Sequence, residues 1–258
     1  MTINELSILE PMLQFRLVAG FEGLHRRVTS ASLLEGGEDL AGLLQGVQAG
    51  DLVVSTLFFA RDNPALVGET LRLLVEKDAA GLAVKTVYFQ DLPRELKDFA
   101  DDNQFPIFFF DDIRMTDLLF CIYDALNTRR ESRYYEAKIR QMFPAEVPDS
   151  TILQSIEEIN PSFQKDYYCA YLTPAIALAS LHDQDALPRY RRMTVELRYS
   201  TLLRFEGGFL LLASFPAGEI PADQAASARE LLFRYQLLPG NFYCGLSRLH
   251  HDMAEMDV

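Results

Sequence analysis

The sequence predicts a parallel α/β domain in its first half, a long helix in the middle and an α+β domain in its second half. Apolar runs and amphipathic stretches alternate between residues 51 and 110, which is typical of a βαβαβ unit. One helical pattern then runs over residues 113–142, and the remaining chain alternates helices with hairpin strands. The length of 258 residues, 49% of them hydrophobic, suits one large or two small globular domains.

The three strands of the first half are almost continuously apolar, as strands covered on both faces require. They are predicted at residues 51–56, 81–85 and 106–110. One intervening helix begins at Asn63-Pro64, with Asn63 as N-cap, and the other begins at Leu92-Pro93 and ends at Asn103. Both helices carry apolar residues at a spacing of three to four, so each has one face for the sheet.

The predicted helix over residues 113–142 is apolar on one side at first, with Leu118, Ile122 and Leu126, and becomes rich in charge from Arg129 onwards. Such a helix suits a connector that also pairs with a second copy, or a solvated linker. The arginines favour a solvated face over a nucleic-acid patch.

The charge balance changes at the same place, since residues 1–128 carry 10 basic and 20 acidic residues and the rest carry 14 and 17. We therefore predict three segments: a first domain over 1–128, a linker helix over 129–148 and a second domain over 149–258.

The second half reads as α+β. Its expected elements follow one another along the chain: a helix capped by Ser150, a strand at 167–172, a hairpin of 200–205 and 209–215 around Glu206-Gly207-Gly208, a helix over 222–235 and a strand at 241–246.

Composition excludes several classes of protein. The formal net charge of −13 argues against non-specific nucleic-acid binding by this chain. Cys121, Cys169 and Cys244 form no CxxC pair, so we expect buried free thiols in a reducing cytoplasm, with no disulfide framework and no zinc site. We expect no signal peptide and no membrane-spanning run, and we expect His250-His251 to be exposed in an acidic tail.

Polar residues follow the three predicted parallel strands where each strand ends. Because ligands of such sheets bind at the carboxyl ends of the strands, Ser55, Thr56, Lys85 and Asp111 are candidate ligand contacts, with Phe58 as a ring that could stack on a planar ligand. The alternatives are that Lys85 simply enters solvent, that Asp111 caps the next helix and that Phe58 packs beneath the helix that follows.

A resemblance to a known family lies in the first half, carried by residues 15–20, 23–28, 50–56, 81–85, 92–93 and 105–110. In order and spacing these stretches resemble the N-terminal domain of the PucR family of bacterial transcription regulators, over about residues 2–126. The resemblance implies a sensor for a small effector, such as a purine breakdown product or another nitrogen-rich or carboxylated catabolite.

The second half is similar to the middle domain of the same family, a degenerate relative of the GGDEF nucleotide-cyclase domain. The similarity rests on residues 203–210 in the hairpin and 244–247 on a later strand. An active cyclase has two acids after the two glycines, whereas Phe209 follows Gly208 here, and the strand at 168–172 lacks the aspartate that would hold a divalent metal. Catalytic residues, metal ligands and cofactors are therefore not assigned.

Family members usually end in a DNA-binding helix-turn-helix, for which this sequence leaves no residues. We expect either a fragment of a longer regulator or a natural variant without that reader, so that DNA is contacted only through a domain missing from this chain. The resemblance implies the signal-sensing, dimerising part of such a regulator: cytoplasmic, homodimeric and without a membrane partner. A protein-interaction scaffold without a ligand is the alternative, and an enzyme is disfavoured because no nucleophile has a base beside it.

Overall fold

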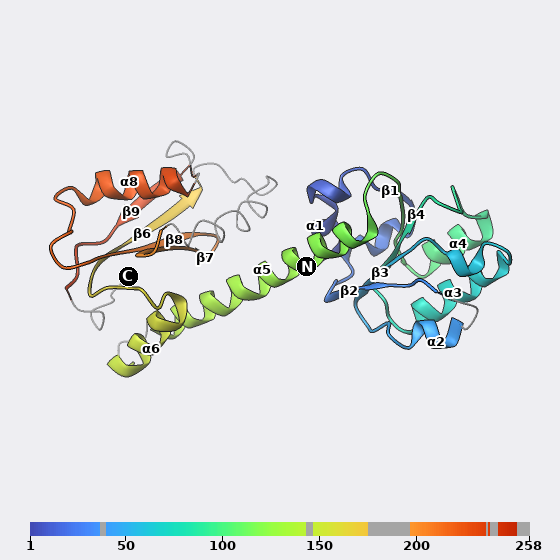
Figure 1. Cartoon of the computed structure of the whole chain (residues 1–258), viewed down its shortest axis with the longest axis horizontal. Helices are drawn as coiled ribbons and strands as arrows, with labels where there is room; N and C mark the ends of the chain where they lie inside the picture. The colour runs from blue at the N-terminus through green and yellow to red at the C-terminus, as the bar shows by residue number, and fades with distance from the viewer. Residues whose placement is uncertain (37–39, 143–146, 175–196, 236, 238–241, 252–258) are drawn as a thin grey trace. The chain divides into compact units, whose positions relative to one another are not determined.

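The computed structural model describes residues 1–36, 40–142, 147–174, 197–235, 237 and 242–251. The chain divides into two compact units, Met1–Asn127 and Thr128–Val258, each with its own sheet (Figure 1). The division falls inside helix α5 (Met115–Met142), close to the long helix predicted at 113–142. Residues 143–146 of the predicted linker lie outside the described residues.

The first unit contains a five-stranded sheet of mostly parallel strands in the order β1-β5-β4-β3-β2. Strands β2 to β5 are parallel to one another, and β1 pairs antiparallel with β5. The strands are β1 (Arg16–Ala19), β2 (Ser30–Leu33), β3 (Asp51–Ser55), β4 (Gly81–Lys85) and β5 (Ile107–Phe110). The three predicted strands are thus confirmed as β3, β4 and β5. One further strand lies at each edge of the sheet, β1 beside β5 and β2 beside β3.

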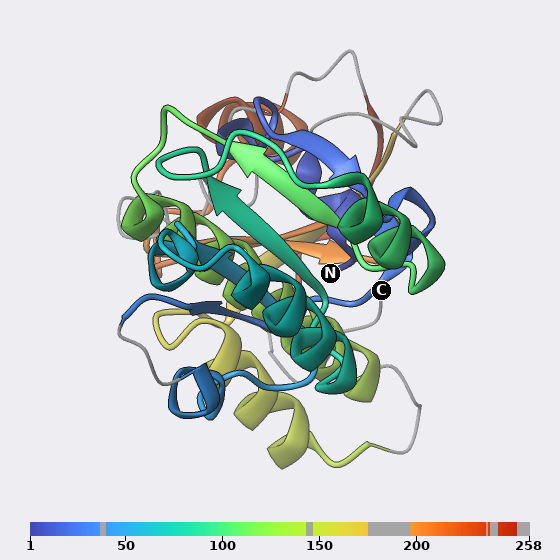
Figure 2. The same ribbon diagram turned by 90° about the vertical axis from the view of Figure 1, so that its right-hand side faces the viewer.

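Helices cover both faces of this sheet. Val53 and Val84 pack in the core cluster that includes residues of α2, α3 and α4, the layer on the near side in Figure 2. Val54 and Ala83 pack in the opposite cluster, with residues of α1 and the first part of α5. The helices are α1 (Ile3–Ser7), α2 (Leu40–Leu44), α3 (Ala65–Glu76) and α4 (Arg94–Asp102), with short 3₁₀ turns η1 (Glu10–Met12), η2 (Phe21–His25) and η3 (Phe58–Ala60).

Residues 20–29 run across the amino edge of the parallel strands. Gly20, at φ +75°, approaches β5 so closely that a Cβ there would lie 2.1 Å from the Phe105 carbonyl oxygen. Further along, the Arg26 guanidinium donates to the Ala79 carbonyl at 2.9 Å, and the Thr29 N–H donates to the Gly50 carbonyl at 2.9 Å. The amino edge is therefore occupied by the chain itself.

The second unit contains a four-stranded antiparallel sheet in the order β7-β8-β6-β9. One face packs against α6 and the last part of α5, and the other packs against α8 (Figure 1). The elements are α6 (Asp149–Ile159), β6 (Asp166–Pro174), β7 (Ser200–Phe205), β8 (Gly208–Phe215), α8 (Gln224–Arg234) and β9 (Phe242–Leu246).

Five local predictions need correction. Cys169 is buried as expected, but Cys121 is half-buried and Cys244 is exposed, so the expected burial of all three thiols is wrong. Helix α3 begins at Ala65 after Pro64, so Asn63 is not its N-cap; likewise Pro148 precedes α6 and Ser150 lies inside it. The hairpin turn is Glu206-Gly207, at φ +46° and +82°, because Gly208 already pairs with Phe205. The expected exposure of His250 is wrong: its backbone bridges to Tyr167 and its ring stacks on the Tyr167 ring, at 5.0 Å between centroids, which buries it.

Candidate functional site

The carboxyl edge of the parallel strands collects polar side chains. Strands β2 to β5 are parallel, so their ends at Leu33, Ser55, Lys85 and Phe110 meet at one edge of the sheet. The opposite edge is crossed by residues 20–29. The carboxyl edge is therefore where segments after the strands can present groups to a ligand.

A hydrogen-bond network joins the ends of β2 and β3. The Thr56 N–H donates to Glu35 Oε1, and the Thr56 hydroxyl donates to Glu35 Oε2 at 2.8 Å. The buried Ser55 hydroxyl donates to the Leu34 carbonyl at 2.6 Å, with Glu35 Oε1 farther away at 3.4 Å. The Ser55 hydroxyl has only one proton, and it donates that proton to the nearer acceptor, the Leu34 carbonyl. Thr56 therefore supplies the two principal hydrogen-bond donors to Glu35.

The backbone after this network adopts a rare conformation. Leu57 is buried and has φ +56°, in the left-handed region that leucine seldom enters. Its N–H donates to Ser55 Oγ at 2.9 Å, which helps to hold the turn. Such conformations cost of order 1–3 kcal/mol and cluster at ligand clamps and active sites. The positive-φ turn at the end of β3 therefore makes this edge a candidate site.

Exposed aromatic and cationic side chains lie beside this turn. The Phe58 ring is 37% exposed and lies 5.5 Å from the ring of Tyr88, which is 45% exposed and follows β4. The Arg61 guanidinium carbon lies 3.8 Å from the Phe58 ring centroid, within the range of a cation–π interaction, and pairs with Asp62 at 2.9 Å. These side chains form a surface on which a planar ligand can stack.

Lys85 and Ser55 do not come together. In the register, Ser55 pairs with Val84, whose side chain lies on the α3 face, so the next residue, Lys85, points to the α5 face. The Lys85 ammonium donates to the Ile113 carbonyl at 2.9 Å. Asp111 follows β5 and is exposed. The five predicted contacts are thus divided: Ser55, Thr56 and Phe58 share one segment, and Lys85 lies across the sheet from Ser55.

Sequence reasoning missed Glu35. It lies just after β2, a strand that was not predicted, and its partners are about twenty residues away. A signal existed in hindsight: an acidic residue follows the apolar pair Leu33-Leu34. Assigning that pair to a strand beside β3 would have placed Glu35 next to Thr56.

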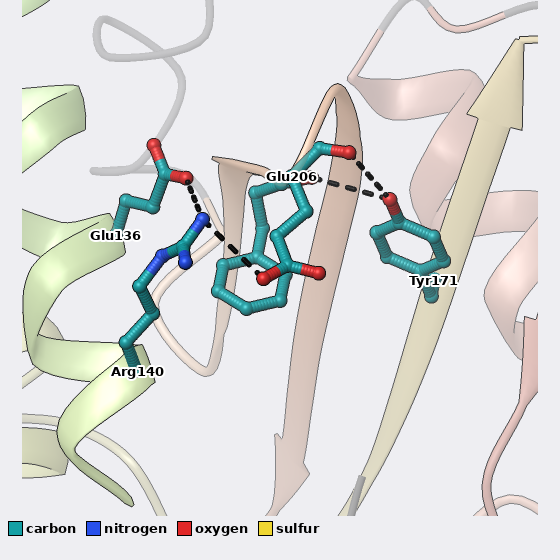
Figure 3. Close-up of polar contacts among 5 residues, drawn as sticks. Glu136, Arg140, Tyr171 and Glu206 are labelled. Atoms are coloured by element: carbon teal, nitrogen blue, oxygen red, sulfur yellow. Dashed lines mark hydrogen bonds and ion pairs between the residues drawn. The ribbon is translucent and has the colours of Figure 1, made fainter. Parts of the chain in front are cut away.

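The second unit carries polar contacts of a different kind. On α5, Arg140 lies between Glu136, at 3.1 Å, and Glu206 of the hairpin turn, at 3.3 Å (Figure 3). The Tyr171 hydroxyl donates to the Glu206 carbonyl at 3.2 Å and so braces the same turn from β6. These contacts tie the end of α5 to the turn between β7 and β8.

A second cluster ties α5 to α6. The Lys138 ammonium and the Tyr134 hydroxyl both donate to Glu158 Oε2, at 2.8 and 2.5 Å. The hydrogen bond from Lys138, followed by that from Tyr134, holds the pKa of Glu158 below its ordinary range. Deeper in the unit, burial raises the pKa of the Cys169 thiol to about 12, so this cysteine is no nucleophile at neutral pH.

The described ranges contain no group of three or more His, Cys, Asp or Glu side chains placed to hold a metal ion. No helix in the same ranges is long and apolar enough to cross a membrane.

The first unit is thus a mostly parallel α/β domain with polar and aromatic groups at the carboxyl ends of its strands. Residues 5–126 match the model of the purine catabolism regulatory protein-like family, PucR. The chain is also similar to the "Purine catabolism regulatory protein" of Bacillus subtilis (strain 168), with 30% identity over 92 residues. That alignment covers 35% of this chain and 17% of the relative. The family match covers most of the first unit, and both similarities support a relation of this chain to the PucR family.

The match to the B. subtilis regulator concerns a small part of that protein, so its activity as a whole does not transfer to this chain. No solved structure matches this sequence significantly.

Proposed function

We propose that this chain is the signal-sensing and dimerising part of a PucR-like transcription regulator. A small catabolic metabolite binds at the carboxyl edge of the parallel sheet in the first unit. Binding shifts the population between two arrangements, because the ligand has a higher affinity for one of them. The change is passed to a DNA-binding domain, and the chain itself is not an enzyme.

The observation that carries this proposal is the polar and aromatic cluster at the carboxyl edge, in a unit that matches the PucR family. Thr56 offers two donors beside a strained turn at Leu57, and Phe58 and Tyr88 leave ring surface exposed. The ligand contacts that we propose are Ser55, Thr56, Phe58, Lys85 and Asp111. Lys85 lies on the other face of the sheet from Ser55. It can contact the same ligand as Ser55 only if that ligand extends past the ends of the strands to both faces.

Helix α5 is the proposed route of the signal. Leu118, Ile122 and Leu126 of this helix pack in the core of the first unit. Ile139 and Met142 of the same helix pack in the core of the second unit. A shift of α5 at one end therefore changes packing at the other, and the Arg140–Glu206 pair would pass it to the β7–β8 turn.

We propose further that the second unit is a degenerate GGDEF-like domain. The strand order β7-β8-β6-β9, with α8 between β8 and β9, supports this because it fits a split βαβ arrangement. The turn Glu206-Gly207 stands where a cyclase would carry its acidic loop, and in this chain Glu206 instead pairs with Arg140.

A thermal-melt screen tests the sensor proposal. The purified chain is screened against purines, ureides and small carboxylates, and a hit at one hundred times its dissociation constant adds about 2.7 kcal/mol, roughly 5–10 °C. Thr56→Val and Lys85→Ala are screened beside the wild type. A shift by one chemical class that Thr56→Val weakens supports the site. If neither substitution changes the affinity of an identified effector, the ligand binds elsewhere.

Exposed rings on α5 favour a second candidate function, a dimerising scaffold without a small-molecule ligand. Phe120 is 74% exposed, and the rings of Tyr123 and Tyr134 are 41% and 49% exposed. The hydroxyls of the two tyrosines are already bonded within the chain, to the Ala31 carbonyl and to Glu158, so Phe120 is the principal exposed ring. Light scattering with the wild type and Phe120→Ser tests it. A dimer that the substitution dissociates supports pairing through α5, whereas a strict monomer at micromolar concentration removes the main support for a scaffold.

A further inference from the structure

We infer that Thr56 forms a binding site for a carboxylate group, and that the side chain of Glu35 occupies this site as a built-in competitor of the ligand. The inference rests on the proposed sensor function and names the chemical class of its effector. It follows from the geometry of the donors at the end of β3.

The two donors of Thr56 fit the two oxygens of one carboxylate. The Thr56 N–H donates to Oε1 of Glu35, and the Thr56 hydroxyl donates to Oε2 at 2.8 Å. Hydrogen bonds to an ionised acceptor are roughly twice as strong as neutral ones, and a two-point arrangement adds directional specificity. Thr56 is buried to 8% exposure, so little water competes for these donors.

The backbone is arranged to release the Thr56 N–H from the sheet. The Leu34 N–H donates to the Val54 carbonyl at 2.9 Å, and continuing this parallel ladder would pair the Thr56 N–H with the Leu34 carbonyl. The Ser55 hydroxyl takes that carbonyl instead, at 2.6 Å. Ser55 also accepts the Leu57 N–H and so supports the positive-φ turn. The ladder thus ends one bond early, and the Thr56 N–H donates to the Glu35 side chain instead of to a strand carbonyl.

The carboxylate that occupies this site is the side chain of Glu35. It is held there by hydrogen bonds from Thr56, with the Ser55 hydroxyl farther away. Glu35 is half-buried, whereas Ser55 and Thr56 are buried. Its tether acts as a high effective concentration of competing carboxylate, which weakens the apparent affinity for any free one. A carboxylate effector therefore binds by displacing the Glu35 side chain from Thr56.

Acetate is the probe that tests the site directly. The full chain is prepared as wild type, Glu35→Ala, Glu35→Gln, Glu35→Ala/Thr56→Val and the control Glu69→Ala, which removes an exposed carboxylate on α3. Melting temperatures are measured in sodium acetate against sodium chloride of equal ionic strength. Glu35→Ala should show a saturable acetate-dependent rise of roughly 3–6 °C, and an acetate affinity at least about tenfold above that of the wild type. Glu69→Ala should match the wild type, and the double variant should lose most of the rise.

Glu35→Gln keeps the fold testable where Glu35→Ala unfolds, since its amide oxygen still accepts one Thr56 donor; it too should bind acetate more tightly than the wild type. Equal acetate responses in wild type, Glu35→Ala and Glu35→Gln would make Glu35 a structural tie only and overturn the inference. A non-carboxylate hit in the metabolite screen, weakened by Thr56→Val, would also overturn the carboxylate class while leaving the sensor proposal intact.

Discussion

The two units place their polar groups in opposite roles. In the first unit, Ser55, Thr56 and Glu35 meet at the open edge of a parallel sheet whose faces are both covered. In the second, Arg140 and Glu158 use their contacts to tie helices to the sheet and to each other. In the first arrangement, the Thr56 donors could bind a ligand in place of Glu35. In the second arrangement, the contacts hold α5 against α6 and the β7–β8 turn. This contrast agrees with our proposal that the first unit senses the effector and that the second unit takes part in transmission.

Two positive-φ glycines, one in each unit, differ in how closely other backbone atoms approach them. Gly20 has φ +75° and its Cβ would collide with the Phe105 carbonyl oxygen, whereas Gly207 has φ +82° with open space around it. We predict that Gly20→Ala lowers the free energy of unfolding by more than about 3 kcal/mol, and Gly207→Ala by about 1–2 kcal/mol. Urea unfolding of both variants measures this. Equal losses would mean that residues 20–29 do not close the amino edge as tightly as described.

Buried serines give the next comparison. Ser55→Ala removes the partners of the Leu34 carbonyl and of the Leu57 N–H, so we expect a loss of about 2–3 kcal/mol. Ser200→Ala in the second unit should lose only about 1 kcal/mol, because the Tyr235 hydroxyl keeps its bond to the Ser200 carbonyl at 3.0 Å. Denaturant midpoints of the two variants test the order, and a reversed order would contradict the network at the end of β3.

The ion pair at the hairpin should matter little for stability. Arg140 and Glu206 are each more than half exposed, and such pairs contribute about 0–1 kcal/mol. We predict that Arg140→Met changes the free energy of unfolding by less than about 1 kcal/mol. A larger loss would show that the cation–π contact with Phe205, at 5.8 Å, contributes more than its exposure suggests.

The smallest expected effect is a pH dependence in the second unit. The pKa of Glu158 lies below its ordinary value of 4.5, chiefly because Lys138 donates to it. Its contribution to stability is therefore present above about pH 4.5 and is lost as the pH falls through the lowered pKa. The difference in melting temperature between wild type and Glu158→Gln should be largest at neutral pH and shrink at acid pH. A constant difference from pH 7 to pH 3 would contradict this.

Much of the first unit could be predicted from its sequence, because β3, β4 and β5 are continuous apolar runs separated by helices that begin after proline. Strands β1 and β2 were missed because they are only partly buried, unlike the equally short β5, and β2 carries Ser30 and Ser32. The separation of Ser55 from Lys85 depends on register, since a shift of one residue reverses the face. The contact of Glu35 with Thr56 needed β2, which local pattern alone did not reveal.

Hydrogen–deuterium exchange of the chain, with and without a ligand found in the screen, tests the central claim most directly. The assignment of sensing to the first unit predicts slower exchange, by tenfold or more, at the amides of residues 55–58, while the amides of β6 and β8 in the second sheet stay unchanged. Protection confined to the second unit, with residues 55–58 exchanging as in the free chain, would contradict it.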